Sequence, residues 1–289
     1  LERRNNGIGV YEIAYKDLKK QAKIGAGSFG DVWKCLWTRL GDLPVAMKKL
    51  KPETINHLLL QKFQSEIEIM VHLEHVNIVK FFGFVWATPN LCLVLEYVDG
   101  GTLSGVMAEE RKKTVPQLTW NHYKMDIAIG TCAALNYLHG GKHVTNMLQQ
   151  QEKKKTSNGG GFRLKRAKAT VQPTDKIIHR DIKGDNILLH AGTFSPKLAD
   201  FGESREVESS LEATMTQVGT PYYLAPEIAT NEQYNESVDV YSFGCVLLEM
   251  GHKGGIRGAF SAQNGMAIIG KIIQGWRPQP WPPVYEGDL

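Results

Sequence analysis

The sequence has few cysteines and no long hydrophobic run. Its four cysteines, none of them in a Cys-x-x-Cys pair, are Cys35, Cys92, Cys132 and Cys245. This spacing excludes a zinc ribbon and favours a reducing compartment, because small secreted domains carry closely spaced cysteines. The longest apolar runs, such as Leu91–Leu95 and Cys245–Leu248, are too short to cross a bilayer. We therefore expect a cytoplasmic protein without a membrane span.

The N-terminus lacks an initiating Met and the apolar core of a signal peptide. We therefore expect a piece of a longer chain. Internal repeats are absent as well. The 289 residues are 42% hydrophobic and 22% charged, which excludes disorder along the whole chain and allows a large core.

The formal net charge of +4 comes from one segment, residues 140–176. It carries nine Lys and Arg against Glu152 and Asp175, so the rest of the chain is mildly acidic. Its Lys-Lys-Lys and Gly-Gly-Gly runs predict a disordered surface insert. A docking or nucleic-acid patch is one interpretation; a tolerated insertion or unspliced sequence is favoured. A nucleic-acid-binding module would depend on this segment alone, with Phe162 as its single aromatic residue, so nucleic acid is not expected as a partner.

Two parts with different periodicity are present. Strands are predicted in the first part, over residues 19–24, 31–36, 44–50 and 91–97, because these runs are rich in β-branched and aromatic residues. One helix interrupts them, where Leu59, Phe63 and Met70 share a face. Beyond the turn at Asp99-Gly100-Gly101, helices are predicted from Tyr123 to Leu138 and from Val238 to Met250. The pattern indicates an α+β fold in two parts.

Residues 25–30 form a G-x-G-x-x-G motif, which occurs both in dinucleotide sites and in phosphate-covering turns. A dinucleotide site needs a helix after the third glycine and an acidic residue about 20 positions further on. The residues after Gly30 are instead strand-like, and Lys48 stands near the position of that acid. A strand–turn–strand flap over phosphates is favoured, because glycine lets the backbone approach closely.

Lys48 lies in a strand that otherwise has the pattern of a buried one. Such a lysine is commonly an exposed edge charge. However, Glu66 is the one charged residue on the apolar face of the neighbouring predicted helix. A Lys48–Glu66 pair would offset the cost of burying the ammonium group and direct it toward a phosphate.

Residues 179–186 combine Asp181, Lys183 and Asn186, and Asp200 follows in an Asp-Phe-Gly sequence. A polar loop before a hairpin is the simplest interpretation. Yet three hard oxygen donors suit Mg²⁺ shared with substrate phosphates, and a carboxylate outside the metal could accept a hydroxyl proton. These groups match phosphoryl transfer, in which positioning and charge neutralisation dominate.

The ordered set of motifs resembles a eukaryotic protein kinase domain. The matching residues are Gly25, Gly27, Gly30, Val32, Val45, Ala46, Lys48, Glu66, His179, Arg180, Asp181, Asn186, Asp200, Phe201, Gly202, Ala225, Pro226 and Glu227. The resemblance covers roughly residues 15–283 apart from the basic insert. Residues 11–30 and 63–82 are most similar to the tyrosine-kinase-like group, near mixed-lineage and plant Raf-like kinases.

The resemblance implies a two-lobed fold with residues 1–14 as a flank, 15–98 as a β-rich N-lobe and 99–289 as a helical C-lobe containing the insert 140–176. The last helices of the C-lobe would be missing, which would leave Glu227 without its usual Arg partner. Met70, Phe81, His179 and Phe201 match the regulatory spine. The oligomeric state stays open.

The resemblance also implies residue roles, with ATP and Mg²⁺ as cofactors. Asp181 would be the catalytic base and Lys183 would steady the transferred phosphoryl group. Asn186 and Asp200 would hold Mg²⁺, and Lys48, fixed by Glu66, would hold the α- and β-phosphates. The implied ATP contacts are Ile24, Gly25, Ala26, Gly27, Ser28, Phe29, Gly30, Val32, Ala46, Lys48, Leu95 (the gatekeeper), Glu96, Val98 and Leu188.

Protein substrates phosphorylated on Ser or Thr are implied by Lys183 and by Gly219-Thr220 before the Ala-Pro-Glu sequence. An Arg180 without a partner would need a phosphate in the activation segment, where Ser209, Ser210, Thr214 and Thr216 are available, and Thr214 or Thr216 is the expected switch. The rival hypothesis is a pseudokinase scaffold. It is disfavoured because the lysine, the base and the metal ligands are all present.

Overall fold

The computed structural model describes residues 8–26, 30–140, 176–206, 221–261 and 264–278. Its contacts divide the chain into two compact units. Of the described part, the first unit holds residues 8–75 and 79–97, and the second holds 76–78, 98–140 and the residues from 176 onward.

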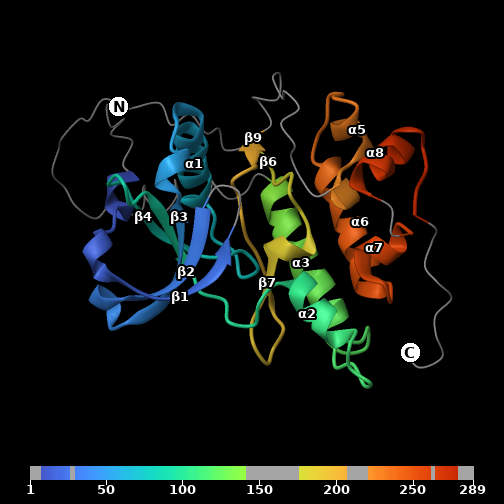
Figure 1. Ribbon diagram of the computed structural model, residues 1–289, viewed down its shortest axis with the longest axis horizontal. Coiled ribbons are helices and arrows are strands. Elements are labelled where there is room, and N and C mark those ends of the chain that lie inside the picture. Colours follow the sequence, from blue (N-terminus) through green and yellow to red (C-terminus); the bar gives the residue numbers. More distant parts are fainter. Residues whose placement is uncertain (1–7, 27–29, 141–175, 207–220, 262–263, 279–289) are drawn as a thin grey trace, which may run out of the picture. The chain divides into compact units, whose positions relative to one another are not determined.

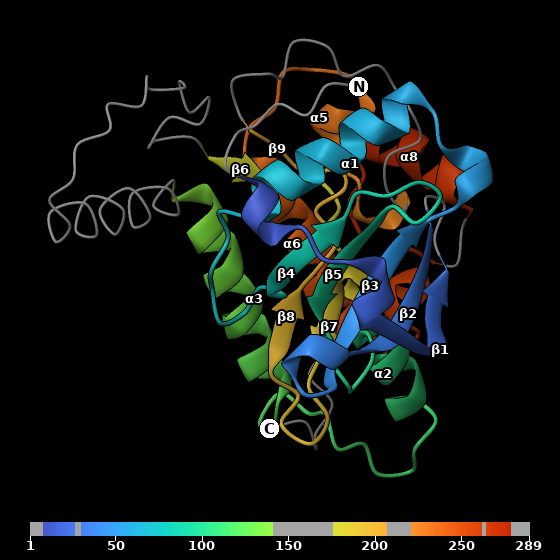
Figure 2. The ribbon, with the colours of Figure 1, turned by 90° about the vertical axis from the view of Figure 1, so that its left-hand side faces the viewer.

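The first unit is built on a five-stranded antiparallel sheet with the order β1-β2-β3-β5-β4. The strands are β1 (Leu18–Ala26), β2 (Gly30–Trp37), β3 (Leu43–Leu50), β4 (Phe81–Val85) and β5 (Cys92–Glu96). Helix α1 (His57–Met70) lies beside the sheet (Figures 1 and 2). The predicted strands and helix of this part are confirmed, and β4 is an addition.

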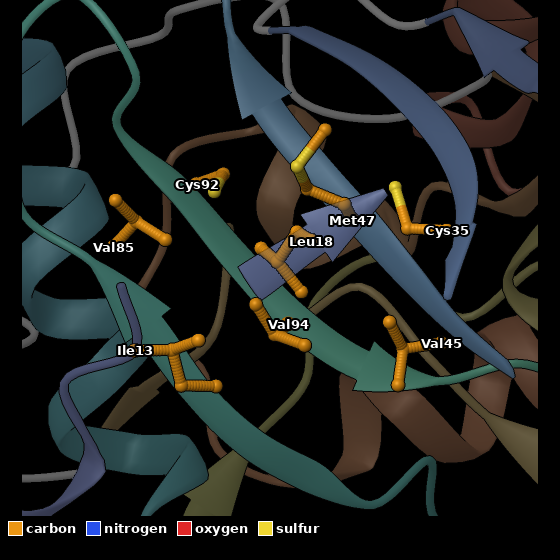
Figure 3. Packing of buried hydrophobic residues seen from close by; sticks show 8 residues of the cluster. All are labelled: Ile13, Leu18, Cys35, Val45, Met47, Val85, Cys92 and Val94. Atoms are coloured by element: carbon orange, nitrogen blue, oxygen red, sulfur yellow. The ribbon is translucent and has the colours of Figure 1, made fainter. Parts of the chain in front are cut away.

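Alternation along β3 separates the two faces of this sheet. Val45 and Met47 are fully buried on one face, while Ala46 and Lys48, which alternate with them, point to the other. The first face carries a hydrophobic core, shown in Figure 3. It consists of Ile13, Leu18, Cys35, Val45, Met47, Val85, Cys92 and Val94.

Residues before β1 extend this sheet. Two short 3₁₀ turns, Ile8–Tyr11 and Tyr15–Asp17, flank a parallel bridge between Glu12 and Phe84 of β4. The Ile13 amide donates to the Phe84 carbonyl over 2.7 Å, and the Ile13 side chain joins the buried core. Gly83 permits this approach, because a Cβ there would lie 2.2 Å from the Tyr11 carbonyl oxygen. Residues 11–13 are therefore part of the packed sheet.

Helix α1 has a defined start and one buried face. The side chain of Asn56 accepts a hydrogen bond from the Leu59 amide over 2.9 Å and caps the helix. The buried positions are Leu59, Phe63, Glu66, Ile67, Ile69 and Met70. They lie three and four residues apart, so the apolar stripe predicted from the sequence faces the interior.

The second unit is mainly helical. Its helices are α2 (Leu103–Glu110), α3 (Lys124–His139), α5 (Pro226–Ala229), α6 (Ser237–Gly251), α7 (Gly255–Ala259) and α8 (Gly265–Ile273). Its short strands form two antiparallel pairs, β6 (Ile177–Ile178) with β9 (Arg205–Glu206) and β7 (Ile187–Leu189) with β8 (Pro196–Leu198). Helices α3 and α6 confirm the two predicted from periodicity; the remaining elements of this unit are additions.

Residues 76–78 belong to the second unit because they attach to β8. Ile78 forms a parallel bridge with Leu198, and the Asn77 side-chain amide donates to the Pro196 carbonyl over 3.0 Å. Of the four free cysteines, Cys132 alone is exposed. Within the described ranges, no helix combines the length and the apolar character needed to cross a bilayer.

Candidate active site

One face of the first-unit sheet gathers several of the predicted nucleotide contacts. Directly paired residues of antiparallel strands point to the same side. Val32 pairs with Lys48, and Ala46 pairs with Leu95. Gly25 pairs with Val32 in turn. These residues therefore share the face opposite the hydrophobic core of Figure 3.

Lys48 on β3 and Glu66 on α1 form a largely buried ion pair. Lys48 Nζ lies 2.8 Å from Glu66 Oε1, and the two side chains are 17% and 8% exposed. Both partners are needed in such surroundings, because an ammonium or carboxylate without an opposite charge is costly to remove from water. The pair fixes the ammonium group on the sheet face that carries Val32 and Ala46.

The glycine motif connects two strands. β1 contains Gly25 and Ala26, and β2 begins at Gly30, with Ala26 paired to Asp31. This is the strand–turn–strand arrangement predicted above, and it excludes the helix that a dinucleotide site requires. Gly27, Ser28 and Phe29 lie outside the described residues.

Gly25 and Gly30 meet different surroundings. A Cβ on Gly30 would lie 2.2 Å from the Lys49 carbonyl oxygen, so this glycine is required for the packing of β2 on β3. A Cβ on Gly25 would meet Val32 at 3.5 Å, which is ordinary contact. Gly30 thus has a structural role whether or not a ligand binds.

The remaining predicted nucleotide contacts lie at the ends of strands. Ile24 on β1 is partly exposed, and Glu96 ends β5. The Glu96 amide donates to the Lys80 carbonyl over 2.8 Å, so this N–H is used within the first unit. Val98 and Leu188 belong to the second unit, where Val98 is buried and Leu188 on β7 bridges to Thr102.

In the second unit, Asp181, Lys183 and Asn186 form one hydrogen-bonded cluster. Lys183 Nζ lies 2.7 Å from Asp181 Oδ2. The Asn186 side-chain amide donates to the same oxygen and to the Asp181 carbonyl, each over 2.8 Å. The Asp181 carboxylate is therefore held in one orientation by a cation and an amide.

Asn186 and Asp200 come from adjacent strand ends. Ile187 pairs with Leu198, and the Ala199 amide donates to the Asn186 carbonyl over 2.9 Å, which places Asp200 one residue further on. Because the Asn186 amide nitrogen faces Asp181, its Oδ1 atom is directed elsewhere. An amide oxygen and a carboxylate are hard donors that fit Mg²⁺. Clusters of three or more His, Cys, Asp or Glu suited to a metal are absent from the described residues.

Asp239 on α6 anchors the segment before Asp181, and sequence reasoning did not single it out. Its fully buried carboxylate accepts hydrogen bonds from the His179 and Arg180 amides, each over 2.8 Å. It also contacts His139 Nε2 at 2.8 Å. Arg180 has a φ of +66°, which a residue with a side chain adopts at a cost. The two hydrogen bonds from the His179 and Arg180 amides to Asp239 stabilise that backbone conformation.

His179 is a fully buried neutral imidazole. The Asp181 amide donates to its Nδ1 over 3.3 Å, so the proton lies on Nε2, which is 3.1 Å from the Ala199 carbonyl. Burial lowers the pKa of His179, against the opposing effect of nearby carboxylates including Asp239. Its ring packs edge-on against Phe201 at 4.9 Å between centroids. The other expected spine residues, Met70 and Phe81, are buried in the first unit.

A second buried carboxylate, Glu249 on α6, was also missed. Its two oxygens accept hydrogen bonds from the Ser104 hydroxyl over 2.7 Å and the Tyr223 hydroxyl over 2.8 Å. Burial raises the pKa values of Glu249 and Tyr223. A charged residue inside the apolar run 238–250 was the available signal, as it was for Asp239.

The expectation of an Arg180 without a partner is wrong. Arg180 Nε donates to the Glu203 carbonyl over 2.5 Å, and Nη1 donates to the Tyr234 hydroxyl over 3.0 Å. A guanidinium group that is 8% exposed must find acceptors, and the folded chain supplies them.

Glu227 accepts a hydrogen bond from Ser237 over 3.2 Å. The candidate phosphorylation sites Ser209, Ser210, Thr214 and Thr216 lie outside the described residues.

Comparison with protein families gives two matches. A model described as "Protein tyrosine and serine/threonine kinase" matches residues 18–152. A second, described as "Protein kinase domain", matches residues 173–275. The two matches cover the sheet of the first unit, the Asp181 cluster and helix α6.

Individual relatives are similar over most of this chain. A G-type lectin S-receptor-like serine/threonine-protein kinase of Arabidopsis thaliana is 38% identical over 83% of the chain. A protein of Dictyostelium discoideum named as a probable serine/threonine-protein kinase is 33% identical over 94%. The Arabidopsis serine/threonine-protein kinase STY46 is 30% identical over 85%. The chain spans 23%, 25% and 35% of the length of these relatives, respectively.

Proposed function

Because the chain carries a protein kinase domain, we propose that it transfers the γ-phosphate of ATP to serine and threonine hydroxyls of protein substrates. The observation that carries the proposal is the Asp181 carboxylate, fixed by Lys183 and Asn186 at 2.7–2.8 Å. Protein kinases generally use ATP with Mg²⁺, and the hard donors Asn186 and Asp200 fit that requirement.

The residues of the second unit would act on the reacting groups. The substrate hydroxyl oxygen attacks the γ-phosphorus, its proton passes to an Asp181 carboxylate oxygen, and the bond to the β-phosphate oxygen breaks to release ADP. Lys183 is close enough to Asp181 to place its positive charge near the transferred group. Asn186 and Asp200 would hold Mg²⁺, which neutralises phosphate charge when bound.

The residues of the first unit would bind the nucleotide. The paired Lys48 ammonium would contact the α- and β-phosphates, and the turn after Gly25 and Ala26 would cover them with backbone amides. Val32, Ala46 and Leu95 offer an apolar surface for the adenine. On the same basis we assign nucleotide contacts to Ile24, Glu96, Val98 and Leu188, and phosphate contacts to residues 27–30.

The finer assignment to the tyrosine-kinase-like group, near Raf-like kinases, is part of the proposal. It is supported by the sequence of residues 11–30 and 63–82 and by the match of residues 18–152 to a tyrosine and serine/threonine kinase model. Four free cysteines support a cytoplasmic setting.

The experiment is transfer of labelled phosphate from ATP to a generic basic protein, followed by phosphoamino-acid analysis. Phosphoserine and phosphothreonine are expected, whereas predominant phosphotyrosine would overturn the substrate class. Asp200→Asn should raise the Mg²⁺ concentration needed for half-maximal rate, because one charged donor is lost. An unchanged Mg²⁺ requirement would remove Asp200 from the proposed metal site.

A further inference from the structure

Arg180, next to the candidate base, contacts two segments of the second unit. Its Nε donates to the Glu203 carbonyl over 2.5 Å, and Nη2 lies 4.0 Å from the Glu203 carboxylate. Its Nη1 donates to the Tyr234 hydroxyl over 3.0 Å. Glu203 is the third residue after Asp200, and Tyr234 lies between α5 and α6. One side chain therefore joins the segments of Asp181, Asp200 and Tyr234.

The Glu203 acceptor is held by its own neighbours. The Ser204 hydroxyl donates to the His179 carbonyl over 3.3 Å, and the Ser204 amide donates to the Phe201 carbonyl over 3.0 Å. One residue further, Arg205 pairs with Ile178 in the β6–β9 ladder. The hydrogen bonds of Ser204 and the pairing of Arg205 thus hold the backbone next to Glu203 against the segment of His179. This places the Glu203 carbonyl beside Arg180.

The Tyr234 ring is held independently of its hydroxyl. It packs against the buried cluster of Ile178, Ala225 and Val238. Ile178 is two residues before Arg180, so the ring packs against the same short segment that carries Arg180. Replacing the hydroxyl with hydrogen would keep this packing and remove the contact with Arg180.

We propose that Tyr234 and Glu203 are positioning residues that keep Arg180, and through it Asp181 and Asp200, in their working arrangement while the activation segment carries no phosphate. The inference rests on the proposed function. A buried guanidinium group needs acceptors, and the Tyr234 hydroxyl and the Glu203 carbonyl serve here, with the Glu203 carboxylate as a nearby opposite charge. A phosphate on Thr214 or Thr216 is then not required for basal turnover.

The activity test uses the chain after complete phosphatase treatment, checked by mass spectrometry. The wild type should transfer phosphate in this state. Tyr234→Phe should lower kcat roughly tenfold, the effect of one hydrogen bond to a charged group, and leave KM for ATP unchanged. Glu203→Gln, which keeps the carbonyl acceptor, should cause a smaller fall. The matched control is Tyr241→Phe on α6, which removes a hydroxyl that makes no hydrogen bond to Arg180 within the described residues and should leave kcat unchanged.

A double-mutant cycle shows whether the effect passes through Arg180. Tyr234→Phe should have little further effect in an Arg180→Ala background, because the shared contact is already lost. Equal falls in kcat in both backgrounds would overturn the proposal. A wild type that loses its turnover on dephosphorylation and regains it on rephosphorylation would overturn it as well.

Hydrogen exchange separates this proposal from the proposed function. Tyr234→Phe, but not Tyr241→Phe, should speed amide exchange over residues 179–186 in the phosphatase-treated chain, whether or not the wild type transfers phosphate. Unchanged exchange would contradict the positioning role. A wild type that never transfers phosphate but shows this faster exchange would overturn the proposed function and retain the contact.

Discussion

Lys48 Nζ on β3 lies 2.8 Å from Glu66 Oε1 on α1, and both side chains are largely buried. This pair joins the central strand of the first unit to its helix and points the ammonium group to the sheet face of Val32 and Ala46. The relationship has consequences for stability and for nucleotide binding that can be measured separately.

Removing one member of the pair should destabilise the chain. Glu66→Gln should lower the free energy of unfolding by about 3 kcal/mol, because the Lys48 charge then lacks its opposite carboxylate in a buried setting. Urea denaturation measures this loss. The control is Glu109→Gln, which breaks the exposed Lys112–Glu109 pair and should cost less than about 1 kcal/mol. Equal effects would show that the Lys48–Glu66 pair is solvated like a surface pair.

Replacing both members should separate stability from activity. Lys48→Met with Glu66→Leu should recover most of the lost stability, because apolar side chains of similar size suit the same surroundings. Phosphate transfer should remain at least about 100-fold below that of the wild type, since the phosphate-binding charge is gone. A double variant with normal turnover would contradict the role proposed for Lys48.

The two described glycines of the motif should respond differently to alanine. Gly30→Ala should lower the free energy of unfolding by about 1–3 kcal/mol, because its Cβ would lie 2.2 Å from the Lys49 carbonyl oxygen. Gly25→Ala should leave stability nearly unchanged and weaken ATP binding, measured by calorimetry. Similar losses of stability in both variants would contradict the difference seen in their surroundings.

Buried His179 should make stability depend on pH. Its pKa is lowered in the folded chain from an ordinary value of 6.5, so below that value the unfolded chain binds a proton that the folded chain excludes. The contribution of His179 to the free energy of unfolding is therefore complete well above pH 6.5. As the pH falls below 6.5, this contribution is lost by up to about 1.4 kcal/mol per pH unit. Denaturation of the wild type and of His179→Gln, measured between pH 5 and 8, separates the contribution of His179 from those of other groups. The exposed His122→Gln variant is the control, and parallel wild-type and His179→Gln curves would refute this origin.

Local patterns predicted most of the secondary structure. A helix or strand that buries one face has apolar residues at regular spacing in the sequence. The spacing of Leu59, Phe63 and Met70 matches α1, and the run from Val238 to Met250 lies within α6. Strand β4 was not recognised, although Phe81, Phe84 and Val85 are buried in the sheet. Gly83 interrupts its sequence, and glycine is disfavoured inside strands.

Long-range polar contacts could not be predicted in the same way. Asp239 is 59 residues from Arg180, and Tyr234 is 54 residues from it, so no local spacing connects them. Such pairs form because the fold buries polar groups that must then find one another. The sequence could suggest that Asp181, Asn186 and Asp200 act together. It could not show that Arg180 has partners within the folded chain.

The most direct test of the central claim compares wild type and Asp181→Asn in a single-turnover assay with labelled ATP, Mg²⁺ and a generic basic protein substrate. Asn keeps the size of the side chain but cannot accept the hydroxyl proton as a carboxylate does. The account predicts that both proteins bind ATP with similar affinity, while transfer by the variant falls at least about 100-fold. ATP binding by both proteins with no transfer by the wild type, or equal transfer by the two, would contradict it.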